Sequence, residues 1–142
     1  MPSKKPLLSY AEVSSQEKAV NRQRILLVED NPDVADSMSL LLRIYGHEVL
    51  VAHNGREAVE IALRERPAIV LMNIGLPCMD GYQSCRAMHD AGLTNTLIVA
   101  VTGYGQERDR RKAEESGFDR YLFKPLDSQA IMDLLACLPA KD

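Results

Sequence analysis

Short apolar runs alternate with longer segments of helical period along most of the chain. The runs lack the polar–apolar alternation of a strand with one face in water and are typical of strands buried on both faces; they lie at about 24–28, 48–52, 69–73, 96–101 and 119–123. Segments with apolar residues three and four positions apart follow the runs and predict helices. Strand and helix alternate five times, which predicts an α/β fold, a doubly wound, mostly parallel sheet with helices on both faces.

Several predicted helices carry residues that favour helix ends. Asn31 and Pro32 suit the N-cap and first position of the first helix, and Gly46 suits its end. Asn54 and Glu57 have the spacing of a capping box at the second helix. Spacing predicts that one face of the first helix carries Val34, Met38, Leu41, Leu42 and Tyr45.

The segment 106–116 is predicted as a helix of unusual composition. Nearly all of its residues are charged, and Ala113 is its main apolar residue. A helix with so small an apolar face buries little surface and is held weakly. We therefore expect this helix to be the element that moves most easily.

Polar side chains follow four of the predicted strands at the point where each strand ends. In parallel sheets all these ends meet at one edge, and ligands bind there. The residues concerned are Glu29 and Asp30 after the first strand, Asn73 at the third, Thr102 after the fourth and Lys124 after the fifth. Each alone has an ordinary explanation as a helix-dipole partner, turn former or surface charge. Their convergence on one edge favours a common site.

The chemistry of these residues suits a phosphoryl group. Adjacent carboxylates bind Mg²⁺, Lys124 supplies a cation for a phosphate, and Thr102 supplies a hydroxyl donor. Positioning and charge neutralisation are most of what phosphoryl transfer requires. A carboxylate at position 73 could form an aspartyl phosphate. Asn73 is a neutral amide with a delocalised nitrogen lone pair and cannot perform that step.

Charge is distributed unevenly over the 142 residues, whose formal net charge is −3. Residues 1–24 hold five basic and two acidic residues, a net +3, which leaves −6 for the remainder. An acidic body repels nucleic acid phosphates, so we expect no nucleic acid partner. We expect a leader or linker at 1–23, helical near 16–22, a single domain at 24–139 and a tail at 140–142.

The chain lacks the features of membrane and secreted proteins. No apolar run approaches the roughly 20 residues that span a bilayer, and the N-terminus lacks the apolar block of a signal peptide. We therefore expect a cytoplasmic location without membrane association. Cys78, Cys85 and Cys137 have no metal-ligand spacing and are interpreted as packing or incidental thiols.

Four groups of motifs follow one another in order along the chain. They are Ile25–Asn31, Leu71–Pro77 with Met79–Tyr82, Ala100–Tyr104, and Gly117–Asp119 with Tyr121–Pro125. Together they resemble the receiver domain of bacterial two-component response regulators. The resemblance covers about residues 24–138, and the motif sequences are most similar to receivers attached to hybrid sensor kinases.

The resemblance implies a flavodoxin-like sheet of order 2-1-3-4-5. It also implies that the domain acts as a signalling switch and not as an enzyme. It implies that Lys124 contacts the phosphoryl group and that the Lys124–Pro125 peptide bond is cis. It also implies that Thr102 and Tyr121 form the switch pair. A histidine kinase or histidine phosphotransfer protein would be the partner. A homodimer or effector contact would use the face at 106–138. The implied Mg²⁺ ligands are Glu29, Asp30, the side chain at position 73 and the backbone carbonyl of Gly75.

Asn73 departs from the family pattern, which has the phosphoaccepting aspartate at this position. Its amide removes the nucleophile and one negative charge, so we expect no phosphorylation and weaker Mg²⁺ binding. Two origins stay open: an isolated or engineered loss in a working receiver, or a natural pseudo-receiver that acts as a phosphorylation-independent interaction module. The intact Glu29, Asp30, Thr102, Tyr121 and Lys124 favour the first. A flavin- or nucleotide-binding protein is disfavoured because the first strand leads into acidic residues, whereas phosphate-cradling loops are rich in glycine.

Overall fold

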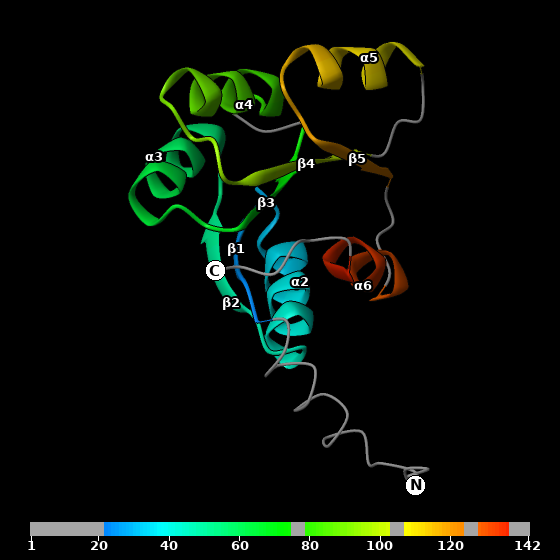
Figure 1. Cartoon of the computed structure of the whole chain (residues 1–142). Coiled ribbons are helices and arrows are strands. Elements are labelled where there is room, and N and C mark those ends of the chain that lie inside the picture. The colour runs from blue at the N-terminus through cyan, green and yellow to red at the C-terminus, as the bar shows by residue number, and fades with distance from the viewer. Residues whose placement is uncertain (1–21, 75–78, 103–106, 124–127, 137–142) are drawn as a thin grey trace, which may run out of the picture.

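A computed structural model describes residues 22–74, 79–102, 107–123 and 128–136 of the protein. Five strands form one parallel sheet of order β2-β1-β3-β4-β5, which confirms the predicted fold class (Figure 1). Most of the helix expected at 16–22 lies outside the described residues. The same holds for Gly75, Lys124 and the expected tail. In chain order the elements are β1 Arg24–Val28, α2 Pro32–Ile44, β2 Glu48–Ala52, α3 Gly55–Glu65, β3 Ile69–Asn73, α4 Gly81–Asp90, β4 Leu97–Thr102, α5 Glu107–Glu115, β5 Arg120–Phe123 and α6 Ser128–Ala136.

The helices form a layer on each face of the sheet, as the alternation of strands and helices predicts. Helices α2 and α6 pack on one face, and α3, α4 and α5 pack on the other (Figure 1). The strands supply side chains to both layers because alternate residues point to opposite faces. Leu26 and Val28 of β1 join the α3–α4–α5 layer, whereas Ile25 and Leu27 join the α2–α6 layer.

The predicted apolar face of α2 matches its buried face only in part. Ala35, Ser39 and Leu42 are buried, whereas Val34 is 42% exposed and Met38 and Leu41 are only partly buried. Small side chains at positions 35 and 39 let the helix approach the sheet closely, and a pattern scored on large apolar residues overlooks them. Leu40 and Ile44 are also exposed. The helix therefore retains an uncovered apolar surface.

The helix caps follow the sequence in part. Asn31 accepts hydrogen bonds from two backbone N–H groups of α2, and Asn54 accepts one from Glu57, as predicted. The reciprocal half of the expected capping box is wrong, because the Glu57 carboxylate accepts from the N–H of His53 at 2.7 Å. A complete capping box that was not predicted begins α4, between Asp80 and Gln83.

Helix α5 packs through one buried apolar residue and through a contact between a cation and an aromatic ring of α4. Ala113 is buried as predicted, and the Lys112 ammonium lies 4.6 Å from the centre of the Tyr82 ring. The Tyr82 ring meets Phe118 edge to face at 6.3 Å. These contacts supplement the small apolar face, and the mobility of α5 stays a prediction.

None of the helices in the described part of the chain combines the length and the apolar character that crossing a membrane requires.

Candidate functional site

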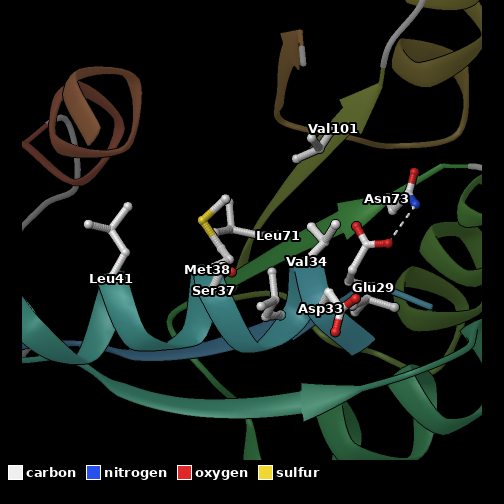
Figure 2. A pocket seen from close by; sticks show the side chains of 11 residues that line it. Glu29, Asp33, Val34, Ser37, Met38, Leu41, Leu71, Asn73 and Val101 are labelled. Atoms are coloured by element: carbon white, nitrogen blue, oxygen red, sulfur yellow. Dashed lines mark hydrogen bonds between the residues drawn. The ribbon is translucent and has the colours of Figure 1, made fainter. Parts of the chain in front are cut away.

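Three side chains meet at the carboxyl ends of β1 and β3. Glu29 and Asp30 follow β1 directly, and Asn73 is the last residue of β3. The Asn73 amide nitrogen lies 3.4 Å from a carboxylate oxygen of Glu29 and 3.4 Å from one of Asp30. Figure 2 shows the amide directed at Glu29. The structure thus brings these three predicted site residues together.

Glu29 is fixed from several directions. Its side chain is buried, its N–H donates to the carbonyl of Ala52, and its carboxylate accepts from the N–H of Asn31 at 3.1 Å. A buried carboxylate is costly unless such donors compensate its lost hydration. The hydrogen bonds to Asn31 and Asn73 therefore hold a negative charge in place between β1 and α2.

The Asn73 amide occupies a position between the two carboxylates that would suit a cation. Its NH₂ group carries two donors, and one atom therefore serves both Glu29 and Asp30. The backbone is fixed as well, because Ile74 donates to the carbonyl of Val101 at 3.2 Å. Asn73 thereby compensates part of the negative charge that the first strand brings to the edge.

The donor set fits a hard divalent cation in part. Carboxylate oxygens from Glu29 and Asp30 are the ligands that Mg²⁺ prefers. Asn73 presents N–H donors in this arrangement, and a rotation of its amide would present the Oδ1 oxygen instead. No group of three or more His, Cys, Asp or Glu side chains is placed to hold a metal within the described ranges. The site therefore offers oxygen ligands with only two formal negative charges.

The two predicted switch residues lie on neighbouring strands. Thr102 is 4% exposed and ends β4, directly after Val101, which pairs with Asn73. Tyr121 lies in β5 on the α3–α4–α5 side of the sheet, where it is partly buried and meets the ring of Phe123 edge to face at 5.2 Å. Their roles as a switch pair stay a prediction.

The backbone after β3 is tied directly to the start of α4. Gly81 donates from its N–H to the carbonyl of Ile74 at 2.9 Å. A Cβ atom at position 81 would lie 2.8 Å from the Cα atom of Ile74, so only glycine permits this approach. The close contact couples the position of Asn73 to the first turn of α4.

A pocket of about 730 Å³ opens beside the carboxylates, between α2 and the sheet (Figure 2). Sequence reasoning missed it, although its signal was present in the large apolar residues of α2 that the sheet leaves uncovered. Its floor is mostly apolar, with polar groups near β1 and the start of α2. Among the described residues it is lined by Leu27, Val28, Glu29, Asp33, Val34, Ser37, Met38, Leu41, Leu71, Asn73 and Val101.

Comparison with known proteins identifies the domain. The family model described as "Response regulator receiver domain" matches residues 25–136. Protein PilH of Pseudomonas aeruginosa is 36% identical over 110 residues, which are 77% of this chain and 91% of PilH. The transcriptional regulator RpaA of Synechocystis is 30% identical over 110 residues, and the chain spans only 46% of its length.

Two solved structures resemble the chain in fold and in sequence. The receiver domain of a sensor histidine kinase from Pseudomonas aeruginosa, with a magnesium ion in its active-site cleft, has a TM-score of 0.74 and 33% identity, over 80% of this chain and 94% of that one. The receiver domain of Ssk1 from Saccharomyces cerevisiae, solved with the histidine phosphotransfer protein Ypd1, has a TM-score of 0.78 and 26% identity, over 82% of this chain and 88% of that one. The chain therefore belongs to the response regulator receiver domain family of two-component signal transduction.

Proposed function

We propose that this chain is a receiver switch domain of a phosphorelay in a form that cannot be phosphorylated. The observation that carries the proposal is the amide of Asn73 between the carboxylates of Glu29 and Asp30. In a working receiver a carboxylate at this position attacks the phosphorus of the donor, and the bond from phosphorus to the leaving group breaks. The Asn73 amide is neutral and its nitrogen lone pair is delocalised, so no acyl phosphate forms.

Magnesium binding is typical of the family, and we propose a weakened site here. Its ligands would be the carboxylates of Glu29 and Asp30, the side-chain oxygen of Asn73 and the backbone carbonyl of Gly75. A bound Mg²⁺ would neutralise charge on a phosphoryl group. Affinity follows ligand charge, and the amide removes one of three negative charges and must also rotate to present its oxygen.

We assign the remaining roles from the placement of the residues. Thr102 is buried at the end of β4, beside the strand that carries Asn73, where a hydroxyl could donate to a phosphoryl oxygen. Tyr121 lies on the adjacent strand β5 and would turn inward when Thr102 moves. Lys124 would supply the cation for the phosphoryl group.

Partners are proposed from the family. Receiver domains interact with histidine kinases or phosphotransfer proteins, as Ssk1 does with Ypd1. We propose such a partner here, a homodimer or effector contact through residues 106–138, and a cytoplasmic location without nucleic acid contact. The same proposal includes the receiver boundaries 24–139, the hybrid-kinase type and an engineered or otherwise isolated origin of Asn73.

The alternative is a natural pseudo-receiver that binds a protein without phosphorylation. Its support is the hydrogen bonding of Asn73 to both carboxylates, which compensates the acidic pair without a metal. Restoring the acid at position 73 separates the two functions, because only a site that is otherwise complete regains phosphorylation.

The test is the intact mass of the protein after incubation with a small acyl phosphate and Mg²⁺. The parent chain is compared with Asn73→Asp, and Asn73→Ala is the control for modification elsewhere. We expect one added phosphoryl group on Asn73→Asp alone. If none of the three gains it, the interaction-module function replaces the receiver function. Modification of the parent chain at residue 73 would contradict the assignment of Asn73 as a dead acceptor position.

A further inference from the structure

Helix α2 carries an apolar stripe that leads from the amino end of β1 to the pocket beside Asn73. Its members recur three or four residues apart, which places them along one side of the helix. Val34 and Ile44 are 42% and 37% exposed, and Met38 and Leu41 line the pocket. Leu40, at 61% exposed, flanks the stripe. A helix with such a face ordinarily covers it with another segment.

The end of this stripe near the pocket is acidic. Glu29 and Asp33 line the pocket, and Asp30 and Asp36 are exposed nearby. No Lys or Arg side chain lines the pocket among the residues that the structure describes. An occupant with an apolar part and positive charge at one end would complement both the floor and the rim.

Residues 1–10 of this chain have that composition. Lys4 and Lys5 are followed by Pro6, Leu7 and Leu8, and the ten residues contain no Asp or Glu. The two lysines match the acidic rim, and the two leucines match the apolar floor.

The position of the leader's attachment allows this contact. The leader joins the described chain at Arg22 and Gln23, and the Gln23 N–H donates to the ring Nδ1 of His47 just beyond the end of α2. From there to the pocket is the length of β1, about 17 Å for five residues. Residues 9–21 span about 43 Å when extended and about 20 Å when helical, so either conformation reaches.

We propose that the segment Lys4–Leu8 docks in cis on the α2 stripe and in the pocket beside Asn73. Leu7 and Leu8 contact Met38 and Leu41, and the lysines pair with Glu29 and Asp33. This inference depends on the described pocket and on the composition of the leader, and it stands or falls independently of phosphorylation.

A photo-crosslink in the full chain tests the contact directly. A benzophenone amino acid replaces Leu8, and a matched control carries it at Val13. After irradiation at low protein concentration, we expect peptide mapping to place the Leu8 crosslinks within single chains on residues 34–41, with Met38→Glu abolishing them. Crosslinks between two chains, or crosslinks spread over the surface as from Val13, overturn the proposal.

A second measurement covers the case in which a label disturbs the docking. Methyl NMR signals of Met38 and Leu41 are compared between the parent chain and Leu7→Ser/Leu8→Ser. We expect the docked population to fall at least about tenfold relative to the free one, because burying a leucine is worth more than a tenfold change in an equilibrium constant. Lys4→Glu/Lys5→Glu should weaken docking, and addition of Asp33→Lys should restore part of it. Unchanged methyl signals in Leu7→Ser/Leu8→Ser overturn the proposal.

Discussion

Replacing Asn73 by aspartate changes the balance of charge at the edge of the sheet. In the parent chain one amide nitrogen donates to Glu29 and to Asp30 at 3.4 Å each. In Asn73→Asp the same contacts become contacts between carboxylate oxygens, and no donor remains between them. We therefore expect the variant to be less stable than the parent chain when no divalent cation is present.

The distances set the size of this effect. Two unit charges 3.4 Å apart repel by about 5 kcal/mol at an effective dielectric constant of about 20 and by about 1 kcal/mol in water. Glu29 is buried and lies nearer the first limit, whereas Asp30 is exposed and lies nearer the second. Side-chain rotation relieves part of the repulsion. We expect a loss of about 2–4 kcal/mol in the free energy of unfolding.

Urea unfolding followed by circular dichroism at pH 7.5 measures this loss. Asn73→Ala is the control, because it removes the hydrogen bonds without adding charge and should cost about 1 kcal/mol. Saturating Mg²⁺ should restore most of the stability of Asn73→Asp, about 2.7 kcal/mol at a concentration 100 times its Kd, and little of that of Asn73→Ala.

The pH dependence supplies the refutation. Repulsion raises the pKa of the carboxyl introduced at position 73, so its penalty is full above the folded-state pKa and disappears as pH falls below the unfolded value of about 4. At that low pH the free energies of unfolding of Asn73→Asp and Asn73→Ala should converge. If Asn73→Asp matches the parent chain at pH 7.5 and low salt without metal, the amide does not compensate the two carboxylates.

Four further residues give independent predictions. Burial lowers the pKa of His47, whose ring accepts from Gln23, so protonation favours the unfolded chain; urea unfolding should show stability falling as pH drops below about 6.5, and His47→Gln should flatten that slope. Burial raises the pKa of Cys85 to about 12, so iodoacetamide at pH 8 should alkylate this thiol only in urea. Peptide mapping that finds rapid alkylation of Cys85 itself in the native protein would contradict this. Among the described residues the buried Ser39 hydroxyl finds no hydrogen-bond partner, so Ser39→Ala should raise the thermal midpoint and add about 1 kcal/mol to the free energy of unfolding. Ser84→Ala removes a bonded hydroxyl and should lower it, and the same sign for both serine variants would refute the reasoning.

The sequence predicted the fold and the meeting of Glu29, Asp30 and Asn73 because both depend on order along the chain. Apolar runs such as Ile69–Met72 can be satisfied only in a sheet covered on both faces, and the polar residues that follow Val28 and Met72 must then meet at one edge. The Asn31 cap and the buried Ala113 were predictable for the same local reason.

The sequence predicted the buried face of α2 only in part. Helical spacing correctly placed Leu42 on that face, but it overlooked Ala35 and Ser39, whose small side chains permit close approach to the sheet. The Glu57 carboxylate likewise accepts a hydrogen bond from the N–H of His53, whereas its spacing predicted the N–H of Asn54 as the donor. Such outcomes depend on the shape of the neighbouring surface, which a single segment does not contain.

By itself, the sequence determined the alternation of strands and helices, the sheet edge that carries Glu29, Asp30 and Asn73, and the neutral amide at position 73. Only the tertiary structure decided that the Asn73 amide lies between the two carboxylates, that Gly81 ties α4 to the end of β3, and that a pocket opens beside α2. The physical reason is that periodicity and propensity act within a segment, whereas cavities and charge pairs arise where separate segments pack.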